Sequence, residues 1–404
     1  MWEQIESNKR KSVLIVTAMG LILVGVGLAL GQLFTGQFQG AFLGGAIAFG
    51  IWLTLWLLTR SRGDDVMLQI AGAREIKKQD HPRLFNVVEE MTIAAQLSKM
   101  PRVFIVDDQS PNAFAVGSDS GKASVAVTIG LLRILNRDEL QGVVAHEIGH
   151  IKNRDVALMT TAGIMLGVIV ILADLGMRAM WLGGATRRSR NNSGGGGGVQ
   201  LVIMIVALIF MILSPILAQL IYFALSRRRE YLADACGAMY TRWPEGLASA
   251  LEKLGGTRVP QADQNRVTAP MYIVRPLRQG EQRSLNSAFS THPPPAERIK
   301  VLRGMGGNAD FHAYDQAFSQ ATGKHVLGTR TLSATDRVDV RAPTALDDDG
   351  GSPHQRLRQA SNAFLAGAGY TRRTCGHCDA VLKIPPERRG RRMACPRCGK
   401  TIST

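Results

Sequence analysis

Four long apolar runs divide an otherwise polar chain. They cover residues 13–31, 40–58, 156–173 and 199–225. Each is close to the ~20 residues that a helix needs to cross the roughly 30 Å hydrocarbon core of a bilayer. The pattern therefore predicts four membrane-spanning helices. The first is expected to be retained rather than removed as a signal peptide, because a second apolar run follows it at once. The alternative is that the third and fourth runs form a hydrophobic hairpin that does not fully cross.

Basic residues beside the first two runs predict their orientation. A cluster at residues 9–11 precedes the first run, and Arg60 and Arg62 follow the second. Because cytoplasmic flanks are enriched in Lys and Arg, these runs are expected to form a hairpin with both ends in the cytoplasm. With four spans, residues 61–155 and 226–404 lie on the same cytoplasmic side of a bacterial-type inner membrane.

The segment 137–155 has the pattern of a helix that carries two histidines. Its sequence is RDELQGVVAHEIGHIKNRD, and Asn136 with Glu139 is the expected N-terminal cap. His146 and His150 are four residues apart, so their imidazoles lie one turn apart on one face and can bind the same zinc ion. Taken alone, such a pair is also consistent with a polar pair on a helix surface.

Three carboxylates complete the candidate catalytic constellation. Glu147 is turned about 100° around the helix from His146, beside an open position of the metal. There it can take a proton from a zinc-bound water and return it to a leaving amine. At the end of the fourth run, SRRREYLADACGA supplies Glu230 as a third ligand and Asp234 as a hydrogen-bond acceptor for a ligand histidine. The alternative for Glu230 is neutralisation of the three arginines that precede it.

Two short β-rich stretches predict strands of a small sheet beside the zinc helix. They are Arg102–Val106 and Ser124–Thr128. An edge strand there can pair with an extended substrate through backbone hydrogen bonds, which suits a protease that accepts many unfolded segments. Asn112 and Ala113 are candidates for holding the scissile backbone, and an ordinary turn is the alternative for this Pro-Asn sequence.

The block THPPPAER supplies two cationic candidates. His292 and Arg298 can donate to the oxyanion of a tetrahedral transition state. The alternative is a Pro-rich connector followed by a helix that begins at Ala296.

These ordered blocks resemble the HtpX-type membrane zinc metalloproteases, which are related to the CAAX prenyl proteases. In chain order they are PNAFAVG (111–117), AVTIGLL (126–132), VVAHEIGHIKNRD (143–155), SRRREYLADACGA (226–238) and STHPPPAERIKVL (290–302). The resemblance implies His146, His150 and Glu230 as zinc ligands and Glu147 as the catalytic acid and base. It also implies cleavage of damaged or misassembled membrane proteins at the cytoplasmic face.

The C-terminal tail has a different character. Residues 333–362 contain few large apolar groups and predict a flexible linker. Beyond it, two Cys-x-x-Cys pairs separated by sixteen residues have the spacing of a zinc ribbon, with the ligands Cys375, Cys378, Cys395 and Cys398. So short a module needs metal to fold, so this zinc is structural. The predicted cofactors are therefore two Zn²⁺, one catalytic and one structural.

Charge is concentrated in this tail. The net charge is +16, although 46% of residues are hydrophobic. Residues 353–404 hold eleven Lys and Arg against Asp379 and Glu387, which gives +9 of that total. The ribbon sequence has no aromatic residue for stacking on bases. The pattern favours membrane lipid headgroups, or a client or adaptor protein, over nucleic acid as the partner of the ribbon.

Together these features predict a mainly α membrane protein with an α+β zincin-like (gluzincin) catalytic domain, four apolar helices and a small C-terminal zinc ribbon. The expected divisions are a transmembrane hairpin (1–60), the first catalytic part (61–155), the third and fourth apolar helices (156–225), the second catalytic part (226–310), a variable region with a flexible linker (311–370) and the ribbon (371–404). The predicted function is a zinc endopeptidase acting on unfolded or misassembled membrane proteins. The competing hypothesis is a membrane-anchored scaffold that works through its ribbon and has an inactive H-E-x-x-H.

Overall fold

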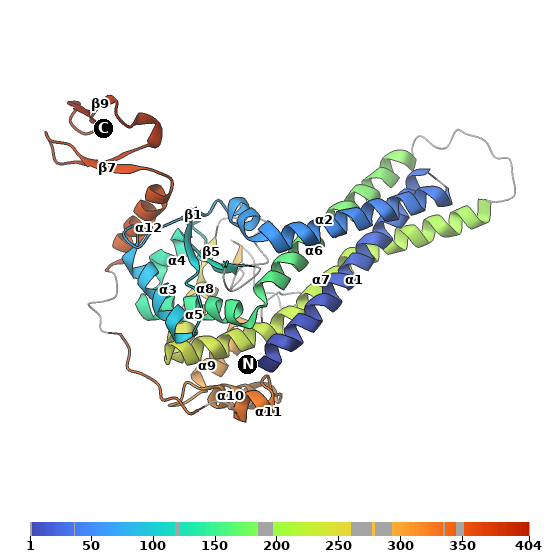
Figure 1. Ribbon diagram of the computed structural model, residues 1–404, viewed down its shortest axis with the longest axis horizontal. Helices are drawn as coiled ribbons and strands as arrows, with labels where there is room; N and C mark the ends of the chain where they lie inside the picture. Colours follow the sequence, from blue (N-terminus) through green and yellow to red (C-terminus); the bar gives the residue numbers. More distant parts are fainter. Residues whose placement is uncertain are drawn as a thin grey trace.

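The computed structural model separates a helical bundle, a catalytic domain and a C-terminal ribbon (Figure 1). It describes residues 2–35, 37–117, 122–184, 197–259, 277–278, 293–333, 336–344 and 351–403. His292, one of the two cationic candidates, lies outside these residues.

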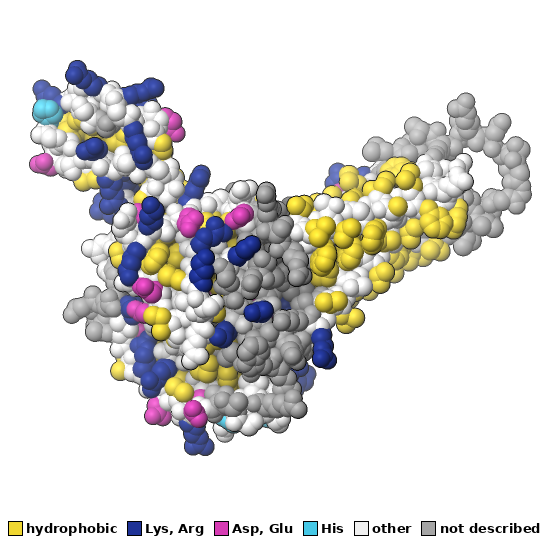
Figure 2. Space-filling model, viewed as in Figure 1, with side chains coloured by type: hydrophobic (Ala, Val, Ile, Leu, Met, Phe, Trp, Pro, Cys, Tyr) yellow, Lys and Arg dark blue, Asp and Glu magenta, His cyan; other side chains and the backbone are white. Residues whose placement is uncertain are grey.

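Four long helices form the bundle. They are α1 (Trp2–Thr35), α2 (Phe38–Ile70), α6 (Val156–Gly184) and α7 (Gly197–Thr241). Among the described residues, three segments are long and apolar enough to cross a membrane, namely Val13–Gln32, Phe38–Leu58 and Thr161–Arg178, and α7 contributes the shorter apolar stretch Leu208–Leu220. The outer face of the bundle is covered with hydrophobic side chains, as expected for a lipid-facing surface (Figure 2).

Small residues let the first two helices approach closely. A Cβ atom added to Gly31 of α1 would lie 2.0 Å from the carbonyl oxygen of Gly40 of α2. Side chains larger than hydrogen therefore cannot occupy this position without separating the helices. Such glycine contacts are a common means of packing helices inside a bilayer.

The catalytic domain contains a four-stranded sheet in the order β1-β2-β4-β3. Its strands are β1 (Arg74–Glu75), β2 (Arg102–Val106), β3 (Ala113–Val116) and β4 (Ser124–Thr128). β2 and β4 coincide with the two stretches expected from the sequence and pair in parallel in the interior of the sheet. β3, which the sequence interpretation did not identify as a strand, pairs antiparallel with β4 and forms an edge.

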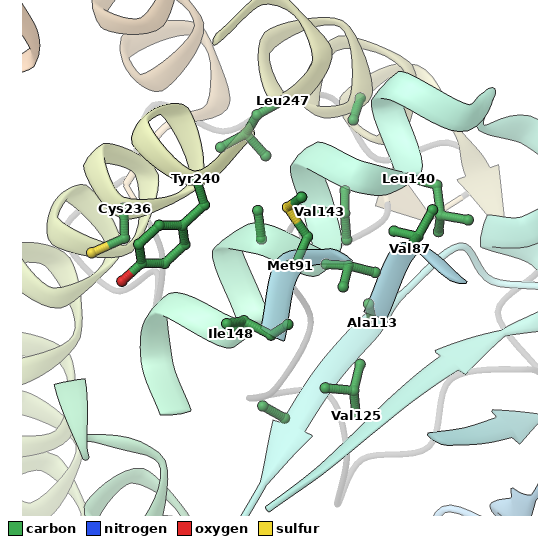
Figure 3. Close-up of a cluster of buried hydrophobic side chains, with 14 of the residues drawn as sticks. Val87, Met91, Ala113, Val125, Leu140, Val143, Ile148, Cys236, Tyr240 and Leu247 are labelled. Carbon is green, nitrogen blue, oxygen red and sulfur yellow. The ribbon is translucent and has the colours of Figure 1, made fainter. Parts of the chain in front are cut away.

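Helices pack around this sheet and enclose one hydrophobic core. They are α3 (Pro82–Ala94), α4 (Ile129–Ile134), α5 (Arg137–Asn153), α8 (Pro244–Gly256), α9 (Pro295–Arg303), α10 (Phe311–Thr322) and α11 (Thr329–Ser333), with the short strand pair β5 (Arg258–Val259) and β6 (Leu277–Arg278). Figure 3 shows α5 at the centre, where Val143 and Ile148 pack among residues of the sheet, α3 and the end of α7. The apolar side of α5 is thus buried, and its position relative to α7 is fixed by packing.

The N-terminus of α5 is capped as the sequence predicts. The Asn136 side chain accepts from the Glu139 backbone N–H, and the Glu139 carboxylate accepts from the Asn136 N–H. Glu139 also accepts from Ser249 and Lys253 of α8, at 2.7 Å each. A cap of this kind typically contributes about 1 kcal/mol, and here it also joins α5 to α8.

The segment expected to be a flexible linker contains ordered structure. Residues 336–344 run along the catalytic domain, where Arg341 donates to Asp138 at 2.6 Å and Gln141 at 2.7 Å on α5, and to the backbone oxygen of Thr241 on α7 at 3.0 Å. Helix α12 (Pro353–Gly367) then packs against α4. The physical reason is that a few polar side chains with buried partners anchor a segment that lacks large apolar residues.

The ribbon follows α12 and consists of two hairpins. One pairs β7 (Thr371–Thr374) with β8 (Val381–Ile384), and the other pairs β9 (Arg392–Ala394) with β10 (Thr401–Ser403). A small core of Cys375, Leu382, Ile384 and Cys395 lies between them. The ribbon projects from the catalytic domain on the side away from the helical bundle (Figure 1).

Candidate active site

Two crossing helices carry the candidate zinc ligands. His146 and His150 lie on α5, and Glu230 lies on α7, the helix that also contains the fourth apolar run. The helices cross closely because α5 has a glycine at the contact, where a Cβ atom on Gly149 would lie 3.0 Å from the Cβ of Cys236. The sequence places both histidines on one face, and α7 brings Glu230 opposite them.

The ligand atoms of His146, His150 and Glu230 lie close enough together to bind one zinc ion. The two Nε2 atoms of His146 and His150 are 3.2 Å apart, and each lies 3.5 Å from an oxygen of Glu230. Tetrahedral ligands at about 2.0–2.2 Å from one ion lie about 3.3–3.6 Å from each other. Two neutral imidazoles and a carboxylate also match the donor set that zinc prefers in hydrolases.

A buried ion pair supports His146. Its Nδ1 lies 2.9 Å from the Asp234 carboxylate, and Arg298 donates to the same carboxylate at 2.8 and 2.6 Å. Arg298 and Asp234 are fully buried. Burial alone would raise the pKa of Asp234, but the charge and hydrogen bonds of Arg298 outweigh it and lower that pKa below its usual range. Asp234 therefore stands where the sequence predicts, and the Arg298 guanidinium is directed at Asp234.

A second carboxylate supports His150. The two oxygens of Asp155 lie 3.1 and 3.2 Å from the His150 Nδ1, and Asp155 is fully buried. The sequence interpretation did not select Asp155, because its side chain is five residues from His150 and so lies outside the i, i+4 spacing of a helix face. The NRD sequence directly after the second histidine is the signal that could have indicated it.

Glu147 lies between the zinc ligands and the edge of the sheet. Its carboxylate is buried and accepts a hydrogen bond from the backbone N–H of Ala115 on β3. Burial raises the pKa of Glu147 above its ordinary value, although the neighbouring histidines act in the opposite direction. A carboxyl group with a raised pKa is a stronger base than usual, which suits proton transfer near neutral pH.

Asn112 and Ala113 lie at the entrance to β3. The backbone N–H of Asn112 donates to the Thr128 hydroxyl, and its carbonyl accepts from the Thr128 N–H, both at 2.9 Å. Since backbone groups alternate in direction along an antiparallel strand, Asn112, Phe114 and Val116 pair with β4, whereas Ala113 and Ala115 face the opposite edge, where none of the described strands pairs. Glu147 lies beside this edge at Ala115.

The four ribbon cysteines also converge. The sulfur atoms of Cys375 and Cys398 are 3.7 Å apart, and those of Cys378 and Cys395 are 3.8 Å apart. Tetrahedral coordination with Zn–S bonds of about 2.3 Å places sulfurs about 3.8 Å apart. The cluster therefore fits a closed structural zinc site.

Known proteins share the catalytic part of this arrangement. The profile of "Peptidase family M48" matches residues 78–306, which include both candidate ligand helices. The chain belongs to peptidase family M48. The ribbon lies outside the matched residues.

Curated relatives are similar over a longer part of the chain. The "Protease HtpX homolog" of Dictyoglomus turgidum is 46% identical over 305 residues, which cover 76% of this chain and 95% of the relative. The homologue of Ligilactobacillus salivarius is 40% identical over 305 residues, with 76% of this chain and all of the relative covered. Among solved structures, S. mikatae Ste24p is similar at 17% identity with a TM-score of 0.39, over 75% of this chain and 67% of that one.

These comparisons confirm the assignment made from the sequence blocks. This M48 chain is a membrane-bound metalloprotease of the HtpX type, and M48 metalloproteases use zinc. A catalytic role of H-E-x-x-H is thereby favoured over the hypothesis of a scaffold in which this motif is inactive.

Proposed function

We propose that this M48 chain is an endopeptidase of the bacterial inner membrane whose catalytic zinc is held by His146, His150 and Glu230. The observation that carries the proposal is the closeness of their ligand atoms: the two Nε2 atoms are 3.2 Å apart, and each lies 3.5 Å from one of the two carboxylate oxygens of Glu230. Zinc bound there supplies an acidified water and polarises the scissile carbonyl. The remaining steps are performed by side chains and backbone of the chain itself.

Glu147 is the proposed acid and base. Its carboxylate takes the proton of the attacking water and returns it to the nitrogen of the leaving amine. The Ala115 N–H holds this carboxylate in place, and burial excludes bulk water that would compete for the proton. Asp234 accepts the Nδ1 proton of His146, so the Nε2 of that ring remains free to bind metal. Arg298 balances the charge of Asp234. We therefore propose that Arg298 holds Asp234 against His146 and does not donate to the oxyanion.

The edge of β3 opposite β4 is the proposed site for substrate backbone. Ala113 and Ala115 face this edge, and Glu147 lies at its Ala115 end. An extended segment that adds to this edge as another strand places its peptide groups beside the catalytic carboxylate. Backbone pairing recognises chain extension more than sequence, which fits unfolded or misassembled membrane proteins as substrates.

The topology proposed for the chain keeps four spans and a cytoplasmic active site. The basic residues on the flanks of the first two spans support this orientation.

We further assign the ribbon to capture of an acidic client or adaptor. Residues 371–404 carry nine Lys and Arg against two acidic residues. The catalytic domain stands between the ribbon and the bundle (Figure 1), which favours a protein partner over lipid headgroups.

Substitution of Glu147 by Gln tests the catalytic proposal. Purified Glu147→Gln protein should retain two zinc ions per chain and lose cleavage of an unfolded substrate such as casein. Glu230→Ala should lose one of the two zinc ions, with the ribbon zinc retained. Undiminished proteolysis by purified Glu147→Gln protein would remove Glu147 from the mechanism.

A further inference from the structure

The joint between the zinc helix and the third membrane helix has an unusual backbone. Helix α5 ends at Asn153, and Arg154 then adopts a left-handed conformation with φ +55° and ψ +37° before α6 begins at Val156. For a residue with a Cβ atom this conformation costs roughly 1–2 kcal/mol. The Arg154 side chain is exposed, so its own contacts do not explain the turn.

The turn brings the next residue back towards the metal centre. Asp155 donates its backbone N–H to the His150 carbonyl at 3.3 Å, and its carboxylate oxygens lie 3.1 and 3.2 Å from the His150 Nδ1. A helical continuation through residue 155 would direct this side chain to another face. The left-handed residue is therefore what places the carboxylate against the imidazole.

The two histidines are supported in different ways. The Asp234 carboxylate beside His146 is shared with Arg298, which neutralises it. Asp155 is equally buried, yet within the described ranges of the chain its carboxylate has no ion pair with Lys or Arg. Burying a carboxylate without a cationic partner costs free energy of folding, unless a hydrogen-bond donor or a positively charged group lies beside it. His150 is the group that it contacts.

We infer that Asp155 is the positioning residue of His150. This role rests on the proposed zinc centre, where Asp155 has two effects on His150. Its carboxylate holds the imidazole proton on Nδ1, so that Nε2 is the ligand atom, and its uncompensated charge strengthens that ligand. Because Asp155 directly precedes α6, the joint between α5 and the membrane helix sets the orientation of one zinc ligand.

The test uses the full-length protein in detergent and measures metal affinity as well as activity. Cobalt serves as the probe, because a thiolate-to-cobalt charge-transfer band marks the ribbon site and distinguishes it from the centre on α5 and α7. Asp155→Asn should weaken metal binding at that centre by about 10- to 100-fold and leave the ribbon affinity unchanged. Excess zinc should restore much of the kcat of Asp155→Asn, with little change in KM.

Arg154 provides a matched pair of variants that leave the carboxylate in place. Arg154→Gly favours the left-handed turn and should keep wild-type metal affinity. Arg154→Val disfavours this turn, so it should displace Asp155 and weaken binding in the same direction as Asp155→Asn. If Asp155→Asn does not fold, the two Arg154 variants still test the role of Asp155.

The outcomes separate two failures. If the wild-type chain binds cobalt at the ribbon alone, the proposed catalytic centre is wrong. If the wild type binds two ions and Asp155→Asn binds both with unchanged affinity, the centre stands and the role of Asp155 is refuted. Equal affinities for Arg154→Gly and Arg154→Val would refute it as well. A loss of thermal stability in metal-free Asp155→Asn with unchanged metal affinity would make Asp155 a structural residue of the joint.

Discussion

Replacing Arg298 by Met removes the cation from a fully buried ion pair while keeping most of the side-chain volume. Arg298 and Asp234 have no exposed side-chain surface, and their two hydrogen bonds are 2.8 and 2.6 Å long. Loss of one partner of such a pair leaves an uncompensated charge and typically costs about 3–5 kcal/mol. For a domain of this size that corresponds to a fall in Tm of roughly 6–20 °C.

The assay is thermal unfolding of the metal-free protein, with Arg303→Met as the matched control. Arg303 lies on the same helix and binds Glu245 and Glu252, but the side chains of this cluster are 42, 45 and 62% exposed. Exposed pairs contribute about 0–1 kcal/mol, so Arg303→Met should shift Tm by a few degrees at most. Similar shifts in Tm for the two variants would refute the conclusion that burial makes the loss of Arg298 more destabilising than the loss of Arg303.

The effect of Arg298→Met should also depend on pH. Arg298 lowers the pKa of Asp234 in the folded protein, so the stabilisation is present above the ordinary pKa of an aspartate and is lost as pH falls through the lowered folded value. The difference in Tm between wild type and Arg298→Met should therefore be largest near neutral pH and shrink in acid. A double variant with Asp234→Asn should recover part of the lost stability, because the charge of residue 234 is then no longer buried without its partner.

Three further predictions test other parts of the molecule. Arg341→Ala removes the hydrogen bonds to Asp138 and Gln141, and should lower the free energy of unfolding by about 1–3 kcal/mol in a denaturant titration; unchanged stability would mean that segment 336–344 does not join α5 to α7. Deletion of residues 371–404, which keeps α12, should release one zinc ion and slow cleavage of a membrane-protein client while sparing a short peptide, and equal loss on both substrates would contradict recruitment by the ribbon. Treatment with a chelator should abolish peptide cleavage and zinc should restore it, whereas recovery with magnesium alone would contradict a His/His/Glu centre.

Features encoded by neighbouring residues could be predicted from the sequence. The i, i+4 pair of His146 and His150, the Asn136 cap and the strands β2 and β4 depend on spacing and propensity within a few residues. The cysteine spacing likewise indicated the ribbon. In each of these cases the tertiary structure preserves a preference that the local sequence already has.

Features that depend on distant partners could not be predicted. Arg298 was a candidate oxyanion donor because a guanidinium near catalytic blocks suggests that role, but its partner Asp234 lies 64 residues earlier in the chain. Segment 336–344 has the polar composition of a linker, and only partners distant in sequence, such as Asp138 and Gln141, make it an anchored segment. Strand β3 is four residues long and follows Pro-Asn, so its sequence is equally typical of a turn.

The continuity of α7 sets how far the active site stands from the membrane. The apolar run of this helix ends at Leu225, and Glu230 follows five residues later without a break in the helix. At about 1.5 Å per residue, the proposed third ligand lies roughly 7–8 Å along the helix from that run. An extended chain advances about 3.3 Å per residue, so a segment emerging from the bilayer needs only about two or three residues to cover the same distance. A folded domain close to its membrane anchor does not release such a segment, whereas an unfolded or misassembled membrane protein does. We therefore expect the proposed substrates to be membrane proteins whose loops have lost their structure near the membrane surface.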